Sequence, residues 1–423
     1  MSFRAYDMKT FLVYPEFALN LACFESFFWS ENQHLHKPTT WYRLKRSIYV
    51  IITIILLVHI CAVTASAFVP RVTPEAEAYS PSDSKLFEVL AIVSYFCCSF
   101  YKMWNIFWRR DDISRVMEEL KALFPSIAKQ KRLAELNESK ERKIGSGGIY
   151  RLEYYEEKSR AIMQFITRYF MFAYVAYNSI PIMQLCFAVI TQQEHITYRA
   201  QANAWYPWHN HNDHSSFLGF MLSYLTQAIV EYTSITFVMS GEFLFCFFTT
   251  QMLMHYNYLC SALSALDASA PDAVKQLKAL ISYHTHLLRL SKLINSIFNL
   301  TFALDLIITT FAISLMGLAI VLVNFADALM FSAGFSFFLL LGYLFCNNGD
   351  EILRETMQIN SAIFYSNWYE GSPEYRRLII FFIMRTKTPC QYQAYGYTPL
   401  SMETYMRILK LSYQMFTSVR AIE

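Results

Sequence analysis

The sequence has little charge and little glycine for its length. Only 16% of its 423 residues are Asp, Glu, Lys or Arg, whereas 55% are apolar and 17% are aromatic. This composition excludes an ordinary soluble domain. Eleven glycines leave little room for a glycine-rich phosphate loop, and no nucleophile motif or carboxylate pair stands in a catalytic context. We therefore expect an integral membrane protein that is not an enzyme, needs no cofactor and binds no nucleic acid.

Long apolar windows dominate the chain, and about 20 helical residues are enough to cross a hydrocarbon core of about 30 Å. Nothing alternates with the short period of a membrane β-barrel, and no short apolar run near the start has the form of a signal peptide. The sequence predicts an all-α seven-transmembrane helix bundle, in which Leu400–Ala421 is the seventh span. The first six windows are Ser47–Val69, Leu86–Trp108, Ala161–Ile190, Phe217–Phe248, Asn299–Val323 and Ala328–Cys346.

Basic residues set the expected orientation. Alternate loops carry 28 Lys and Arg on one side of the membrane and 3 on the other. The basic side stays in the cytoplasm, so the N-terminus is expected inside and the C-terminus outside. A G-protein-coupled receptor has the opposite orientation, and its Asp-Arg-Tyr and Asn-Pro-x-x-Tyr motifs are absent. None of the nine cysteines falls in an outside loop, so no extracellular disulfide is expected.

The last span differs from the other six because one of its faces is polar. Polar or small residues recur at helical spacing, and the opposite face is apolar. A polar stripe at membrane depth indicates water beside it. The stripe consists of Glu403, Arg407, Lys410, Gln414, Thr417 and Ala421, and the apolar face of Tyr405, Leu409, Met415, Phe416 and Val419.

The last quarter of the chain contains a series of motifs at Ala362–Glu370, Tyr375–Leu378, Phe382–Arg385, Leu400–Tyr405 and Ile408–Tyr413, and an outside loop contains Ala204–Trp208. The motifs resemble the closing signature of insect odorant receptors, and the loop resembles that family's second extracellular loop. The resemblance is to a ligand-specific subunit rather than the co-receptor. Gustatory receptors of the same superfamily share a pair like Thr404-Tyr405 but continue to Gln-Phe, where this chain has Leu411-Ser412-Tyr413. A gustatory channel or a multi-pass transporter is the alternative.

The resemblance implies a subunit of an odorant-gated, non-selective cation channel. Such subunits form a heterotetramer with an odorant co-receptor in the plasma membrane of olfactory neuron dendrites, and no G protein is required. We divide the chain accordingly into a cytoplasmic N-terminal segment (1–46), a six-span bundle with the odorant pocket (47–346), a cytoplasmic helical anchor (347–399) and a pore-lining span (400–423). Candidates for the subunit anchor are Ile352, Ile363 and Trp368.

Two sets of residues are candidates for the pore, and both stay open. Matching the family signature places Met415, Ser418 and Ile422 near the constriction, whereas the polar stripe suggests Lys410, Gln414 and Thr417. The two faces differ by one residue, which is about 100° on a helix.

A volatile, apolar odorant must be held by burial, worth about 0.8 kcal/mol per CH₂, and by one or two polar anchors. Aromatic residues and methionines in the outer halves of the spans suit that task, although any one of them more often serves helix packing. The candidates are Leu90, Tyr95, Tyr174, Tyr177, Asn178, Met221, Tyr224, Met316 and Phe335. In the outside loop, His209, His211 and His214 have metal-like spacing but no scaffold, so we expect a solvated loop and no metal.

Overall fold

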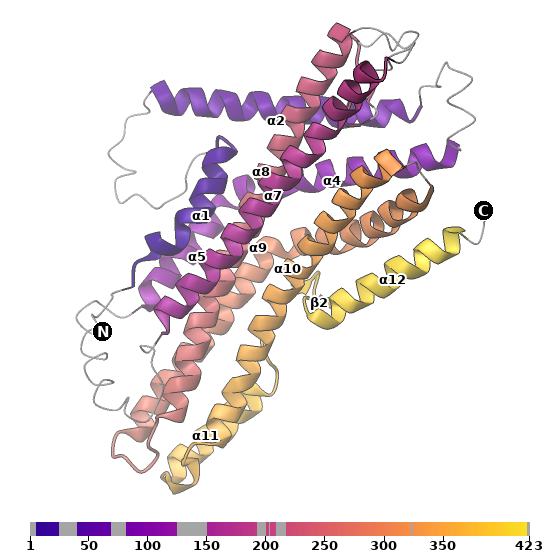
Figure 1. Cartoon of the computed structure of the whole chain (residues 1–423). Coiled ribbons are helices and arrows are strands. Elements are labelled where there is room, and N and C mark those ends of the chain that lie inside the picture. Colours follow the sequence, from indigo (N-terminus) through magenta and orange to yellow (C-terminus); the bar gives the residue numbers. More distant parts are fainter. Residues whose placement is uncertain are drawn as a thin grey trace.

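The computed structural model of the chain describes residues 6–24, 40–68, 82–124, 150–192, 200–202, 204–208, 217–322 and 325–420 (Figure 1). These residues are almost entirely helical, which confirms the predicted fold class. The helices are α1 (Met8–Leu21), α2 (Thr40–Ser66), α4 (Ser82–Trp108), α5 (Arg110–Leu123), α7 (Leu152–Ile190), α8 (Phe217–Ser264), α9 (Ala273–Leu322), α10 (Phe325–Phe364), the 3₁₀ turn η1 (Trp368–Glu370), α11 (Pro373–Thr386) and α12 (Met402–Arg420).

Helix α8 is the centre of the bundle. From Thr233 to Tyr256 almost every side chain is buried, whichever way it points. A helix that is apolar on all sides needs neighbours on all sides. These neighbours include α1, α2, α4, α7, α9 and α10. The position of α8 in the core therefore follows from its composition.

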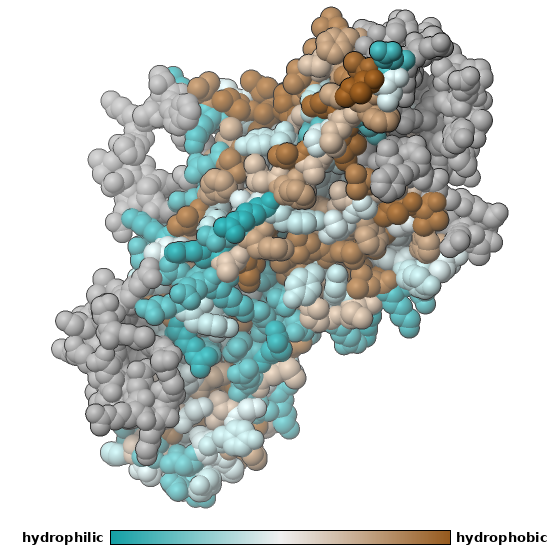
Figure 2. All heavy atoms as spheres, in the orientation of Figure 1, coloured by the Kyte–Doolittle hydropathy of each residue, from teal (hydrophilic) through white to brown (hydrophobic). Residues whose placement is uncertain are grey.

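Six helices among the described residues are long and apolar enough to cross a membrane, as predicted. Two of them are much longer than a membrane requires. With 48 residues in α8 and 50 in α9, at about 1.5 Å per residue, each is about 75 Å long, against a hydrocarbon core of about 30 Å. We refer to the end of the bundle where α8 finishes, α9 starts and α11 packs as the α11 end. Figure 2 shows apolar residues gathered on the opposite half of this face and polar residues nearer the α11 end.

The predicted boundary between residues 346 and 347 does not coincide with a break in the helix. Helix α10 runs without interruption from Phe325 to Phe364. The sequence becomes more polar after Cys346, but a helix leaving the membrane changes its surroundings without changing its backbone. The segment predicted as a cytoplasmic anchor thus starts inside α10 and includes α11.

A small hairpin connects α11 to α12. Strands β1 (Gln393–Ala394) and β2 (Thr398–Pro399) pair antiparallel, and its tip has positive φ angles at Tyr395 (51°) and Gly396 (73°). The left-handed region is costly for residues with a Cβ, so the glycine eases this turn. The amide of Gln393 donates to Asn295 Oδ1 on α9 at 2.8 Å. The hairpin is therefore attached to α9 just before the chain turns into α12.

Candidate functional site

One face of α12 packs on α9 and α10 (Figure 1). The hydroxyl of Ser412 donates to the carbonyl oxygen of Thr310 at 3.0 Å, and the hydroxyl of Ser314 donates to the carbonyl oxygen of Ser412 at 3.1 Å. Tyr405 donates to the carbonyl oxygen of Leu339 at 3.1 Å. Small hydroxyl side chains allow two helix backbones to approach closely and supply hydrogen bonds between them. These bonds fix the rotation of α12 about its own axis.

The opposite face of α12 is exposed in the single chain, and it carries the polar stripe. Glu403 and Arg407 form an ion pair at 2.6 Å, and both side chains are 74% exposed. Charged side chains on a spanning helix need water or another protein chain beside them. The other exposed stripe residues are Lys410, Gln414 and Thr417, with Ser418 next to them.

The five predicted pore residues that the structure describes lie on different sides of α12. Lys410, Gln414, Thr417 and Ser418 face away from the chain's own helices. Met415 turns towards α9, where its sulfur lies 3.8 Å from the Ser314 hydroxyl. Ile422, like Ala421 of the stripe, lies outside the described residues.

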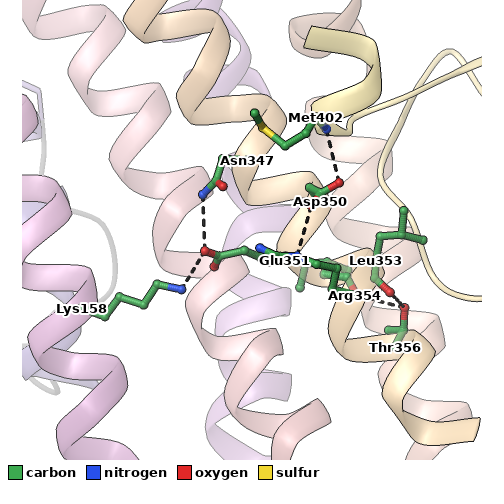
Figure 3. A network of polar contacts seen from close by, with 9 residues as sticks. Lys158, Asn347, Asp350, Glu351, Leu353, Arg354, Thr356 and Met402 are labelled. Atoms are coloured by element: carbon green, nitrogen blue, oxygen red, sulfur yellow. Dashed lines mark hydrogen bonds and ion pairs between the residues drawn. The ribbon is translucent and has the colours of Figure 1, made fainter. Parts of the chain in front are cut away.

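The start of α12 is held closely by α10 (Figure 3). A Cβ added at Gly349 would lie 2.5 Å from the carbonyl oxygen of Leu400 and would also collide with its Cβ, so only glycine permits this approach. The next residue, Asp350, accepts a hydrogen bond from the backbone amide of Met402 at 3.3 Å. A carboxylate at a helix N-terminus satisfies a free amide and matches the helix dipole.

A second carboxylate in Figure 3 links α10 to α7 beside the start of α12. Glu351 accepts hydrogen bonds from Lys158 Nζ at 2.7 Å and from Asn347 Nδ2 at 3.4 Å. The Lys158 side chain is 31% exposed and that of Glu351 is 14% exposed. Because this pair is partly exposed, its contribution to stability is modest.

A buried ion triad lies deeper in the bundle and was not anticipated from the sequence. Lys102 on α4 pairs with Glu242 on α8, and with Asp305 on α9 at 2.9 Å. All three side chains are 1–6% exposed. The Cys98 thiol also donates to Asp305, at 3.2 Å. Ionisable residues within apolar spans were the available signal, since such residues are rare there unless paired.

Four of the nine predicted ligand residues come together near the end of the bundle opposite α11: Tyr174, Tyr177, Asn178 and Tyr224. The Tyr224 hydroxyl donates to the carbonyl oxygen of Asn178 at 2.8 Å, and Tyr177 donates to that of Gln201 at 3.2 Å. Tyr174 donates to the carbonyl oxygen of Ala228 at 3.3 Å. Their hydroxyls therefore bond to backbone of α7, α8 and the 200–202 segment.

Three further polar residues complete this group, which we call the Asn178 cluster: Gln201, Gln227 and Glu231. The amide of Asn178 donates to Glu231 Oε2 at 2.7 Å and accepts from Gln201 Nε2 at 2.7 Å. Gln227 exchanges two hydrogen bonds with the backbone of Ala202. Sequence reasoning sought apolar and aromatic side chains and missed these partners. The Asn178 cluster can supply the polar anchors of a ligand site.

The remaining five ligand candidates are placed by other contacts. Tyr95 packs edge-on against Phe337 and Phe338. Met316 and Phe335 lie at the α9–α10 contact, near Gly334 and Gly317 respectively. Leu90 is 50% exposed, and Met221 is half-buried. Neither of the two cavities described for this chain is lined by any of the nine.

The predicted anchor residues are mostly internal. Ile352 and Ile363 are buried in the chain's own core, so they support α10 from within, and only Trp368 is half-buried. A partner surface must instead use apolar side chains that the single chain leaves exposed. At the α11 end these include Met357, Phe364, Tyr365, Phe381 and Met384.

Two buried histidines lie in the extensions of α8 and α9 beyond their apolar windows. The ring of His255 is hydrogen-bonded through Nδ1 to the Tyr283 hydroxyl at 2.6 Å. Burial, with a smaller effect of His286, lowers the pKa of His255 to about 3. Burial, assisted by Arg385, lowers the pKa of His284 to about 4. Both rings are therefore neutral at physiological pH.

Comparison with known proteins agrees with this architecture. A family model described as 7tm Odorant receptor matches residues 84–413. Two isoforms of the putative odorant receptor 69a of Drosophila melanogaster are similar to this chain. Isoform A is 31% identical over 78% of this chain and 79% of its own length. Isoform B is 28% identical over 99% of this chain and 100% of its own length. The olfactory receptor OR5 of Machilis hrabei, solved in complex with eugenol, superposes with a TM-score of 0.75 over 98% of both chains at 13% identity.

Proposed function

Because the chain belongs to the insect family of seven-transmembrane odorant receptors, we propose that it is the ligand-specific subunit of an odorant-gated, non-selective cation channel, assembled as a heterotetramer with the odorant co-receptor. This is a family of receptors and channels rather than enzymes. The subunit acts in the plasma membrane of olfactory neuron dendrites, and it gates without a G protein. The basic loops place the N-terminus and the α11 end in the cytoplasm and the C-terminus outside.

The exposed polar face of α12 carries this proposal. The Lys102–Glu242–Asp305 triad of the other spans is buried, whereas α12 presents Glu403, Arg407, Lys410 and Gln414 away from its own chain. Lipid does not tolerate such a face, whereas a water-filled pore between subunits does. We assign Lys410, Gln414, Thr417 and Ser418 to the pore wall and Met415 to the contact with α9.

Adjacent residues on opposite faces of α12 offer a direct test. In a Gln414→Cys variant, a charged thiol reagent should reduce the odorant-evoked current, because residue 414 faces the pore. The Met415→Cys variant is the matched control and should respond much more slowly, because its side chain faces α9. Wild type, which has nine cysteines of its own, sets the background. Equal block of both variants would contradict the assignment of α12 to the pore wall.

We place the odorant between the spans at the Asn178 cluster. Three tyrosines surround it, and Asn178, Gln201 and Glu231 provide hydrogen-bonding groups that an ester, aldehyde or alcohol could engage. The Machilis hrabei receptor was solved with eugenol, a small aromatic ligand, so eugenol is a reasonable first probe.

Whole-cell recording tests the function as a whole. Cells expressing this chain with and without an insect odorant co-receptor receive a panel of volatiles that includes eugenol, in the absence of GTP. We expect a fast cation current that requires both the odorant and the co-receptor. Silence under both conditions, with surface expression verified, would contradict gating by volatiles.

A further inference from the structure

A cavity of about 280 Å³ opens between α4, α9 and the β1–β2 hairpin, well away from the Asn178 cluster and the exposed face of α12. Its size approaches the smallest ligand pockets of proteins, which start at about 300 Å³. Neither the pore nor the odorant site proposed above uses it. Its wall includes Trp104 and Trp108 from α4, Arg109 between α4 and α5, Asn299 from α9 and Tyr395 from the hairpin tip.

The cavity lies at a membrane boundary, as two independent sequence windows indicate. The apolar window of α4 ends at Trp108, and Arg109 follows immediately. The apolar window of α9 begins at Asn299. Both boundary residues line the same cavity. A cavity at this level is within reach of lipid head groups.

Its aromatic wall is of the kind found at membrane interfaces. Phe100, Trp104 and Trp108 are stacked in sequence along α4, with ring centroids 6.0 and 5.8 Å apart. Trp104 is 46% exposed and Trp108 is 72% exposed. Exposed tryptophans with one apolar side and one polar atom favour the head-group level of a bilayer.

The remaining wall is mainly polar, with Ile297 and Leu300 as its apolar members, and it carries one cation. Arg109 lines the cavity, and its guanidinium also reaches Asp112 at 3.1 Å while remaining 45% exposed. Asn299 accepts a hydrogen bond from the backbone amide of Tyr395, which joins the cavity to the hairpin. An arginine with several hydrogen-bonding neighbours suits a phosphate ester, because guanidinium binds phosphate oxygens in a fixed geometry.

We propose that this cavity binds the phosphate head group of a membrane phospholipid, with Arg109 on the phosphate and Trp104 and Trp108 against the glycerol and upper acyl chains. The choice of leaflet rests on the orientation proposed above, which makes it the cytoplasmic, anionic leaflet. The hairpin whose tip lines the cavity is followed directly by α12. It is closed by a hydrogen bond from the Leu400 amide to the carbonyl oxygen of Tyr392 at 2.8 Å. A bound lipid therefore steadies the segment from which α12 starts.

Lipid retention measured by native mass spectrometry tests the inference on the full chain. Purified wild type is titrated with palmitoyl-oleoyl phosphatidylserine, with the phosphatidylcholine analogue, or with inorganic phosphate. Arg109→Gln removes the cation that lines the cavity, and Arg109→Lys restores its charge. Arg115→Gln is the matched control, because Arg115 approaches the same Asp112 at 3.8 Å but does not line the cavity.

We expect one tightly retained phosphatidylserine per chain, with an affinity reduced about fivefold by Arg109→Gln, as expected for one basic residue at an anionic surface. Arg109→Lys should recover most of this loss, Arg115→Gln should match wild type, and excess inorganic phosphate should leave the lipid bound. Equal retention by wild type and Arg109→Gln, or displacement by inorganic phosphate, would overturn the inference. Wild type that conducts normally without retaining lipid would refute this inference alone, whereas wild type that retains lipid but gives no current would refute only the proposed function.

Discussion

Replacing Lys102 with methionine removes the cation that pairs with both Glu242 and Asp305. Two carboxylates would then face each other within apolar spans, with side chains no more than 6% exposed. Breaking a buried ion pair by removing one partner costs about 3–5 kcal/mol, because the remaining charge stays desolvated. We therefore expect Lys102→Met to lower the melting temperature of the detergent-purified protein by about 3–6 °C, given the entropy of unfolding of a chain of this length.

A compensating variant separates charge from packing. Neutralising all three positions together, as Lys102→Met with Glu242→Gln and Asp305→Asn, leaves no unpaired charge and should recover most of the lost stability. The matched control is Lys158→Met, which removes a cation from the partly exposed pair with Glu351. It should lower the free energy of unfolding by about 1 kcal/mol or less.

Fluorescence-detected size-exclusion after heating provides the measurement for all four proteins. If the triple variant were as unstable as Lys102→Met, the loss would come from packing of the lysine stem rather than from the unpaired carboxylates. If Lys102→Met matched wild type, the carboxylates would be neutral or hydrated and the desolvation argument would fail.

Three further predictions concern Gly349, two buried histidines and the Asn137 sequon. Gly349→Ala should abolish odorant-evoked current while surface expression persists, because its Cβ would displace the start of α12, whereas Gly317→Ala, whose nearest neighbour would lie at 3.6 Å, should conduct normally. Acid should destabilise the α11 end: the pKa values of His255 and His284 are lowered to about 3 and about 4, so their stabilisation is complete above the unfolded value of about 6.5 and is lost as pH falls below it. The free energy of unfolding should therefore fall by about 2 kcal/mol per histidine between pH 6.5 and 5. A variant with both His255→Gln and His284→Gln should show a smaller dependence of thermal stability on pH. The Asn137 sequon should carry no glycan, because its loop is cytoplasmic in the proposed orientation. A gel shift on glycosidase treatment would show that the orientation is the opposite one.

Run length and helical spacing were enough to predict the membrane spans and the polar face of α12. An apolar window needs no partner to be recognised, and residues three or four apart share a helix face whatever surrounds them. The same reasoning did not show that α10 is continuous across residues 346 and 347, because the change to polar composition occurs inside one helix. It also could not tell that Ile352 and Ile363 face the chain's own core, since an amphipathic helix looks the same whether its apolar side meets its own chain or a partner.

Long-range polar pairs were the harder part of the prediction. Lys102 meets partners 140 and 203 residues away, and no local period connects such positions. Each member is an ionisable residue in an apolar span, so the sequence could have marked them as residues requiring partners. Their pairing depends on how α4, α8 and α9 pack together, which periodicity does not encode. The Asn178 cluster is the same kind of case, because Gln201 comes from a connecting segment.

The packing of α12 determines how an odorant could open the channel. The Asn178 cluster belongs to α7, α8 and the 200–202 segment, whereas α12 is held mainly by α9 and α10, which in turn pack on α8. A ligand at the cluster must therefore shift α9 or α10 to reach the pore. Moving a gate from nearly closed to nearly open takes a difference in binding of about 5.5 kcal/mol between the two states. A small odorant supplies about 0.3–1.5 kcal/mol per heavy atom in total, and only the part that differs between states contributes. We therefore expect a small odorant to activate the proposed channel only partially.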